Sequence, residues 1–111
     1  MKIVAVRPGE WARIEEIENT LEAMQAFVGG YIEAVPWDIY GTVLVCNEEG
    51  KLLGLPENRR VLLGGVAEEV IRGNFFFCGT EGDEFEELPQ EMMWSLCGRL
   101  QDKGPEELIA E

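Results

Sequence analysis

The sequence predicts a single α+β domain, with a mostly antiparallel sheet and two helices. First, 111 residues with 46% hydrophobic content are close to the commonest size of a one-core domain. Second, short runs of β-branched and aromatic residues alternate with turn residues, as antiparallel strands do. Third, two stretches carry apolar residues at helical spacing. We expect the domain to span residues 1–104, and residues 105–111 to form a frayed acidic tail.

The N-terminal segment is expected to form two strands. Residues 2–7 are rich in β-branched side chains and end at Pro8-Gly9, which predicts a strand followed by a turn. Residues 11–17 alternate imperfectly between two faces, so they can pair back as a second strand. Together they predict an antiparallel hairpin.

A helix and a third strand come next. Asn19 followed by Glu22 predicts an N-cap with a capping-box carboxylate, and apolar residues follow at helical spacing. Gly29-Gly30 should end this helix, because glycine adopts the left-handed conformation that closes helices. Residues 31–35 then alternate as a strand, before Pro36 interrupts it.

The central segment predicts one buried strand and a hairpin turn. Residues 42–46 are a continuous β-branched run, which is typical of a strand buried on both faces. The sequence Asn47-Glu48-Glu49-Gly50 predicts a turn into a returning strand at residues 51–53. For residues 61–70 we expect an irregular loop or a short helix, because two glycines interrupt the run.

The C-terminal segment predicts the most buried strand and a helix. Residues 71–78 contain three consecutive phenylalanines that should anchor the core, and Phe85 should begin a short strand after a polar turn. Pro89 is expected at the first helical position. Trp94 lies off the apolar stripe of that helix, so it is expected to be exposed and to mark a surface for self-association. The apolar stripe itself is Met92, Met93, Leu96, Cys97 and Leu100.

Composition excludes several function classes. Nine basic and 22 acidic residues give a net charge of −13, which repels phosphate backbones and argues against direct nucleic-acid binding. The absence of histidine removes the usual general base and the commonest metal ligand, so we expect no catalytic residue, metal or cofactor. Three separated cysteines in apolar segments, with no signal peptide and no membrane span, predict a cytoplasmic protein with reduced thiols.

Residues 46–60 form a polar, turn-rich segment that concentrates the side chains able to recognise a ligand. Guanidinium groups bind phosphate bidentately, amides can read ring or ribose edges, and aromatic rings can stack on a base. The alternatives are ion pairing of the arginines with surface carboxylates and packing of the aromatic rings in the core. The candidate ligand-binding residues are Asn47, Asn58, Arg59, Arg60, Tyr31, Trp37, Arg7 and Arg72.

Residues 29–33 (Gly-Gly-Tyr-Ile-Glu) and 47–59 (Asn-Glu-Glu-Gly-Lys-Leu-Leu-Gly-Leu-Pro-Glu-Asn-Arg) resemble a small bacterial and phage family catalogued as domain of unknown function 3846. The resemblance extends over most of residues 2–80. It implies a setting in phage, plasmid or other mobile-element genomes, often near anti-restriction genes, and it brings no assigned catalytic residue. After about residue 80 the sequence departs from the family pattern. Further matching segments are residues 8–9, 19–22 and 73–76.

Two functions from different classes are therefore expected. The first is a non-enzymatic, homo-oligomeric accessory protein that sequesters a small anionic nucleotide-type ligand used as a host-defence signal. The second is an acidic DNA mimic that binds and inhibits a restriction or other host defence protein, since most carboxylates follow residue 60. Hydrolysis by carboxylates is disfavoured, because nothing in the sequence fixes two carboxyl groups across a cleft.

Overall fold

The computed structural model describes residues 1–37, 41–63, 67–101 and 108–110. Within these residues the chain forms two helices and two sheets, which confirms the predicted α+β class and the two helices. The helices are α1 (Leu21–Val28) and α2 (Gln90–Arg99). The strands are β1 (Lys2–Val6), β2 (Arg13–Glu16), β3 (Ile32–Pro36), β4 (Thr42–Asn47), β5 (Glu57–Leu63), β6 (Ala67–Arg72), β7 (Phe75–Glu81), β8 (Glu84–Glu86) and β9 (Leu108–Ala110).

The larger sheet has the strand order β2-β1-β7-β4-β3, with β8 also paired to β7. All of its pairings are antiparallel, as predicted. The smaller sheet has the order β6-β5-β9. Its β5–β6 pair is antiparallel and its β5–β9 pair is parallel. The C-terminal strand β9 therefore lies in a sheet, whereas we expected a frayed tail there.

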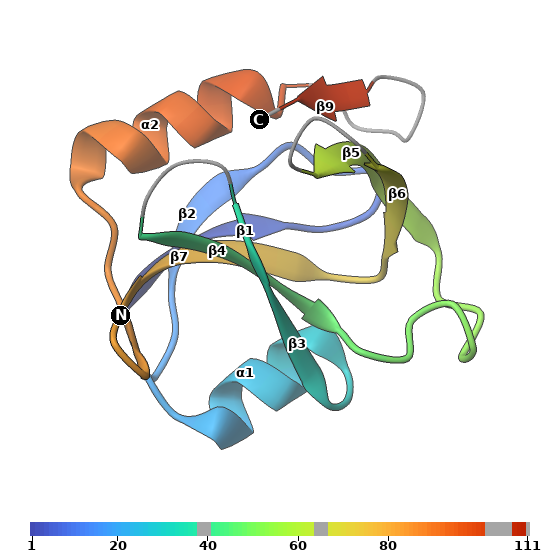
Figure 1. Cartoon of the computed structure of the whole chain (residues 1–111), viewed down its shortest axis with the longest axis horizontal. Coiled ribbons are helices and arrows are strands. Elements are labelled where there is room, and N and C mark those ends of the chain that lie inside the picture. Colours follow the sequence, from blue (N-terminus) through green and yellow to red (C-terminus); the bar gives the residue numbers. More distant parts are fainter. Residues whose placement is uncertain (38–40, 64–66, 102–107, 111) are drawn as a thin grey trace.

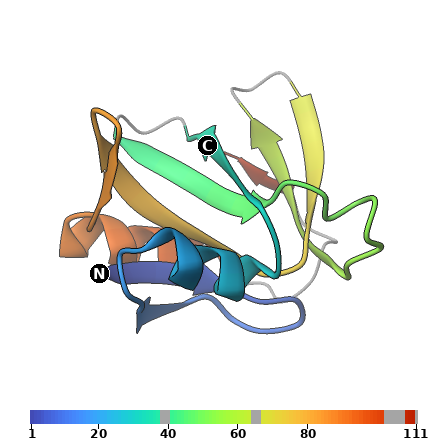
Figure 2. The same ribbon diagram turned by 90° about the horizontal axis from the view of Figure 1, so that it is seen from below.

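The larger sheet is covered on both faces, with α1 on one side and α2 on the other (Figures 1 and 2). The smaller sheet lies on the same side as α2 and contributes to the same core. The α1 core consists of Ile3, Ala5, Met24, Val28, Val43, Val45, Phe76 and Cys78. The α2 core includes Val4, Val6, Trp37, Leu44, Val61, Ile71, Phe75, Phe77, Met93, Leu96 and Leu100.

Strand β7 supplies side chains to both cores. Phe75 and Phe77 point into the α2 core and Phe76 into the α1 core, and all three are fully buried. This alternation follows from the two-residue period of a strand. The predicted strand at residues 71–78 is wrong in one respect, because it is split at Gly73. That glycine has a φ of 77°, so the chain turns there between β6 and β7.

The caps of α1 agree with the sequence at one end only. Gly29 ends the helix with a φ of 82°, as predicted. The N-cap is Thr20, however, not Asn19: the Thr20 hydroxyl oxygen accepts a hydrogen bond from the Ala23 N–H at 3.2 Å. The Asn19 amide instead donates to the carbonyl oxygen of Phe85 at 2.9 Å, which ties the start of α1 to β8.

Two predictions about the central segment are wrong. Residues 51–53 form turns and no strand, and the Leu52 side chain is 84% exposed. Residues 61–63 and 67–70 belong to the β5–β6 hairpin, where we expected a loop or short helix. The strand period of β5 is hidden in the sequence because Arg59 takes an inward position, two residues before the buried Val61. A register shift between Glu57 and Arg59 blurs the period further.

Helix α2 packs against the core through the apolar stripe that the sequence predicts. Met93, Leu96 and Leu100 are buried, and the rest of the stripe packs partly against them. Pro89 is the N-cap residue of this helix, one position before the predicted one. Trp94 is exposed, as predicted. Neither helix in the described part of the chain is long and apolar enough to cross a bilayer.

Candidate functional site

The sequence-predicted site residues lie in separate places. Trp37 is buried in the α2 core, where its ring packs edge-on against Phe77 with the centroids 5.0 Å apart. Tyr31 is 66% exposed, just before β3. Arg60 forms an ion pair with Glu68 at 2.7 Å across the β5–β6 hairpin. These three side chains do not converge on one hollow.

Asn58 and Arg59 are interior residues with no exposed surface. The Asn58 amide nitrogen donates to the carbonyl oxygens of Val6 at 3.0 Å and Gly73 at 2.8 Å. The Arg59 guanidinium donates to the Asn58 Oδ1 at 2.8 Å and to the carbonyl oxygen of Glu10 at 2.6 Å. These contacts fasten β5 to the end of β1 and to the β6–β7 turn. A ligand on the surface of this structure would not reach either side chain.

Two further asparagines hold the last turn of α1. The Asn47 amide donates to the carbonyl oxygen of Val28 at 3.1 Å, and its Oδ1 accepts from the Glu49 N–H at 2.7 Å. The Asn74 amide donates to the carbonyl oxygen of Phe27 at 3.1 Å. Backbone carbonyls at a helix C-terminus have no intrahelical partner, so these amides satisfy them. Asn47 therefore has a structural role that the sequence did not reveal.

Asn74 lines a surface groove between the C-terminal end of α1, the Pro8-Gly9 turn and the loop before β5. The groove has a volume of about 390 Å³, within the range of small-molecule sites. Its lining is predominantly apolar. The main lining side chains are Pro8, Phe27, Leu55, Pro56 and Asn74.

Arg7 lies beside this groove, and contacts with Phe27 and Glu15 orient its guanidinium group. Its guanidinium carbon is 4.9 Å from the centroid of the Phe27 ring, a cation–π arrangement. Its two terminal nitrogens both donate to the Glu15 carboxylate, with the Nη2–Oε1 pair at 2.9 Å. The hydrogen bond from Arg7 is the main reason that the pKa of Glu15 falls to about 2. Arg13 also donates to Glu15, at 2.7 Å.

Arg72 lies next to the groove-lining Gly73. It donates to the carbonyl oxygen of Leu55 at 3.2 Å and to the Glu57 carboxylate at 3.2 Å. Its side chain is 30% exposed, and that of Arg7 is 25% exposed. The structure therefore brings two of the eight predicted residues, Arg7 and Arg72, to the margin of one hollow.

Sequence reasoning missed the apolar lining of the groove. Phe27 belongs to the apolar stripe expected for the first helix, and Leu55 and Pro56 belong to the turn-rich segment 46–60, so none of them was a candidate site residue. The available signal was the presence of Leu52, Leu53 and Leu55 in an otherwise polar, turn-rich segment.

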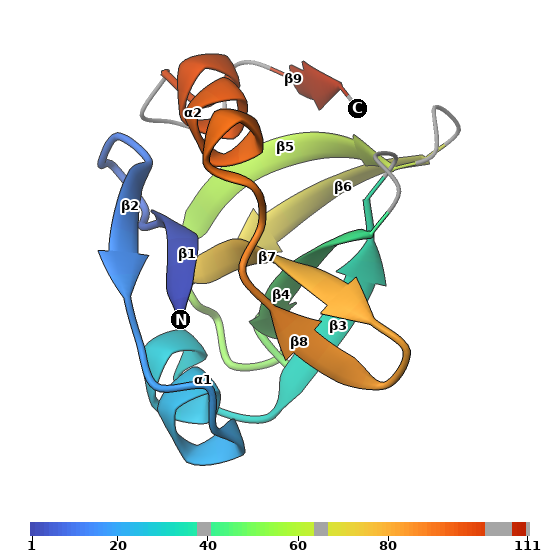
Figure 3. The ribbon, with the colours of Figure 1, turned by 90° about the vertical axis from the view of Figure 1, so that its left-hand side faces the viewer.

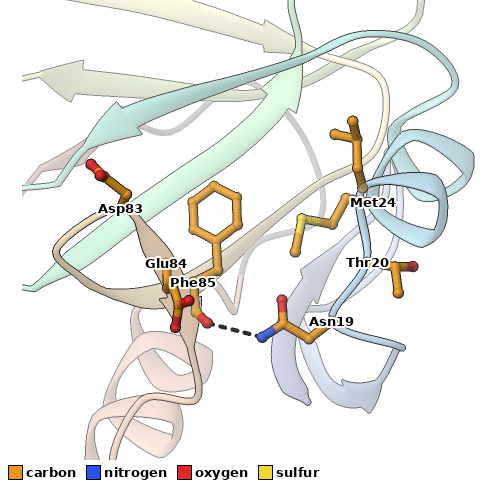
Figure 4. Close-up of a pocket in the computed structure, with 7 residues that line it drawn as sticks. Asn19, Thr20, Met24, Asp83, Glu84 and Phe85 are labelled. Carbon is orange, nitrogen blue, oxygen red and sulfur yellow. Dashed lines mark hydrogen bonds between the residues drawn. The ribbon is translucent and has the colours of Figure 1, made fainter.

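A second hollow, of about 340 Å³, lies between the start of α1 and the β7–β8 hairpin (Figure 4). The side chains of Met24 and Phe85 point toward this hollow, and Asn19 spans it to the Phe85 carbonyl oxygen. Asp83 and Glu84 form its other wall and are exposed. Two carboxylates repel an anion, so the groove beside Arg7 is the better candidate for an anionic ligand.

The cysteine thiols are unfavourable nucleophiles. Burial raises the pKa of Cys46 and of Cys78 to about 12, and it also raises the pKa of Cys97. Among the described residues, no group of three or more His, Cys, Asp or Glu side chains is arranged to hold a metal ion.

The fold and the groove define a small α+β domain with an apolar surface groove. Asparagine side chains bond to backbone carbonyls of the segments around this groove. The chain belongs to the family described as Domain of unknown function (DUF3846), whose model matches residues 1–101. This confirms the resemblance found in the sequence but corrects its extent. The match runs through α2 to residue 101, whereas we expected the sequence to depart from the family after about residue 80. No curated protein and no solved structure matches the chain significantly.

Proposed function

We propose that this protein is a non-enzymatic accessory protein of phage or mobile elements that sequesters a small nucleotide-type ligand in the cytoplasm of the bacterial host. The observation that supports this most is the position of two guanidinium groups, Arg7 and Arg72, beside an apolar groove. In a protein with a net charge of −13, such a place is where an anion with a flat, apolar ring would be least repelled.

The ligand's ring would lie on the apolar lining made by Phe27 and Leu55, and its phosphate would approach Arg7. Guanidinium groups bind phosphate with two parallel hydrogen bonds, so Arg7 would have to share or exchange its bonds to Glu15. Glu15 would remain paired in that exchange, because Arg13 already donates to it. This lowers the cost of releasing Arg7 to a ligand.

A thermal-shift panel tests this proposal with cyclic dinucleotides, cyclic mononucleotides and ADP-ribose derivatives. A ligand at a hundredfold excess over its Kd should stabilise the protein by about 2.7 kcal/mol, which corresponds to roughly 10 °C for a domain of this size. Mass spectrometry of the recovered ligand should show it unchanged, because we propose no turnover.

The matched variants are Arg7→Gln and Arg13→Gln. Each variant removes one of the two arginines that donate hydrogen bonds to Glu15, but only Arg7 lies beside the groove. Arg7→Gln should weaken the binding of a panel ligand at least about tenfold, the loss expected for a charge-assisted contact, while Arg13→Gln should not. A panel without any hit, or equal affinities in both variants, would contradict the proposal.

A second candidate is an acidic inhibitor that mimics DNA or otherwise binds a basic surface of a host defence protein. It is favoured by the exposed carboxylates of the β7–β8 hairpin, namely Glu81, Asp83, Glu84, Glu86 and Glu87. Desolvation and the neighbouring Glu81 raise the pKa of Glu86. Binding of this kind should weaken steeply with salt and with Asp83→Lys, whereas Arg7→Gln should leave it unchanged.

A further inference from the structure

Two exposed tryptophans lie on one side of the molecule, away from the groove. Trp11, in the turn between β1 and β2, is 64% exposed, and Trp94, on α2, is 58% exposed. Figure 3 shows this turn beside α2. Trp11, Ala12, Cys97 and Gly98 line a hollow of about 430 Å³, and Trp94 lies one helical turn before Gly98.

Neither tryptophan is needed to fill the core of this fold. Helix α2 already buries Met93, Leu96 and Leu100 on its inner side, and Trp94 is on its outer side. Large apolar side chains that gather on a surface around a hollow mark an interaction site, and tryptophan is among the residues that contribute most to binding at interfaces.

We propose that this face, made of Trp11, Ala12, Trp94, Cys97 and Gly98, is the interface of a two-fold symmetric dimer of this chain. The partner is identified by charge. Each chain carries a net charge of −13, so two copies repel each other unless the surfaces that meet are locally balanced in charge. Among the described residues of this face, Glu10 and Arg13 lie on either side of Trp11 and Ala12, and α2 carries Glu91 in its first turn and Arg99 in its last, so these charges balance.

The flanking charges can also complement a second copy. Glu10 and Arg13 are already 3.8 Å apart and remain 50% and 60% exposed. In a two-fold interface the same patch lies on both subunits, so each carboxylate can approach an arginine of the partner. A basic protein partner would have less reason to choose this face, because the unbalanced carboxylates are on the β7–β8 hairpin.

The exposed tryptophans would form the centre of a small interface. A tryptophan side chain carries about 150–250 Å² of surface, so the exposed parts of the two together supply roughly 200–300 Å². A standard interface buries about 800 Å² on each partner. The remainder would come from the outer side of α2 (Gln90–Arg99) and from the turn around Trp11, with a polar rim around an apolar centre.

Sedimentation velocity over a wide range of concentrations tests this proposal on the full chain without any ligand. The unmodified chain should form a dimer as concentration rises, and Trp94→Ser should raise the dimer Kd by roughly thirtyfold, as loss of a central hot spot does. Leu52→Ser is the matched control, because it removes a more exposed apolar side chain far from the tryptophans in sequence. Its dimer Kd should be unchanged.

Intrinsic fluorescence gives a second readout. Trp11 and Trp94 should shift their emission to shorter wavelength as the dimer forms, while the buried Trp37 should not respond. Circular dichroism of Trp94→Ser should match the unmodified chain, because the side chain is outside the core. A chain that stays monomeric at every concentration, or a dimer that persists unchanged in both Trp11→Ser and Trp94→Ser, would overturn the proposal.

Discussion

The side-chain amide of Asn58 donates a hydrogen bond of 2.8 Å to the carbonyl oxygen of Gly73. The same nitrogen donates to the Val6 carbonyl oxygen, so one buried amide joins β5, the end of β1 and the β6–β7 turn. Each carbonyl would otherwise lie in the interior without this partner. The geometry around Asn58 therefore depends on a single side chain.

Replacing Asn58 with alanine should destabilise the fold severely. The change removes both of these hydrogen bonds and one of the acceptors of Arg59, and it leaves buried polar groups unsatisfied. We expect a loss of about 3 kcal/mol of unfolding free energy and a fall in Tm of roughly 10–15 °C. Urea and thermal denaturation measure both. Asn19→Ala is the control. It removes one exposed hydrogen bond donated by a side-chain amide, and this should cost less than about 1 kcal/mol of unfolding free energy.

A methyl group at Gly73 should reshape the groove. Its Cβ would lie 2.7 Å from Leu55 Cδ1, so the Leu55 side chain must move, and the φ of 77° is strained for alanine. Gly82→Ala is the control, since its φ is 62° but nothing lies within 4 Å of the added atom. Both variants should lose about 1 kcal/mol from backbone strain. Only Gly73→Ala should lower the affinity of a ligand that binds in the groove. Calorimetry with that ligand would measure the difference.

Stability should depend on the Glu15 carboxylate in a defined pH range. The pKa of Glu15 falls from 4.5 to about 2 on folding, mainly through the Arg7 hydrogen bond. A carboxyl group with a lowered pKa binds protons more readily when unfolded, so its contribution is fully present above about pH 5 and is lost between there and pH 2. Glu15→Gln should therefore be less stable near neutral pH and approach the unmodified chain toward pH 2. Denaturation curves at several pH values with parallel profiles would contradict this.

The three thiols should differ in reactivity. With a pKa near 12, Cys46 and Cys78 are ionised in only about one molecule in ten thousand at pH 8, and both are buried. Cys97 is partly exposed in the single chain, so in dilute, monomeric protein it should react first with a thiol reagent. Peptide mass spectrometry of briefly labelled native protein measures the order. Equal labelling of all three cysteines is expected only in denaturant, and equal rates in the native state would rule out the packing described here.

Elements with a purely apolar sequence pattern could be predicted from the sequence. Strand β4 follows from its β-branched run, and the buried stripe of α2 follows from helical spacing. Strand β5 could not be recognised in the same way, because Asn58 and Arg59 occupy buried positions that normally hold apolar side chains. The polar groups that made these residues look like ligand-binding groups are used on backbone carbonyls.

The groove could not be predicted from local patterns. Phe27 and Leu55 are distant in the chain and meet only because Asn47 and Asn74 hold the end of α1 against the loops. Amides make the same hydrogen bonds to a ligand and to a carbonyl group, so composition alone does not separate the two roles. Arg7 and Arg72 remain beside the groove because their neighbours Pro8 and Gly73 line it.

The position of β7 between β1 and β4 also orders events during synthesis of the chain. Strands β1 and β2 can pair early, and so can β3 and β4, but these two hairpins join only through β7. Because β7 ends at Glu81, roughly three quarters of the polypeptide must leave the ribosome before the α1 core can close, and the α2 core must wait for α2 as well. Until then the inner faces of β1 and β4 stay uncovered, so this is the stage at which the nascent chain most needs protection from aggregation.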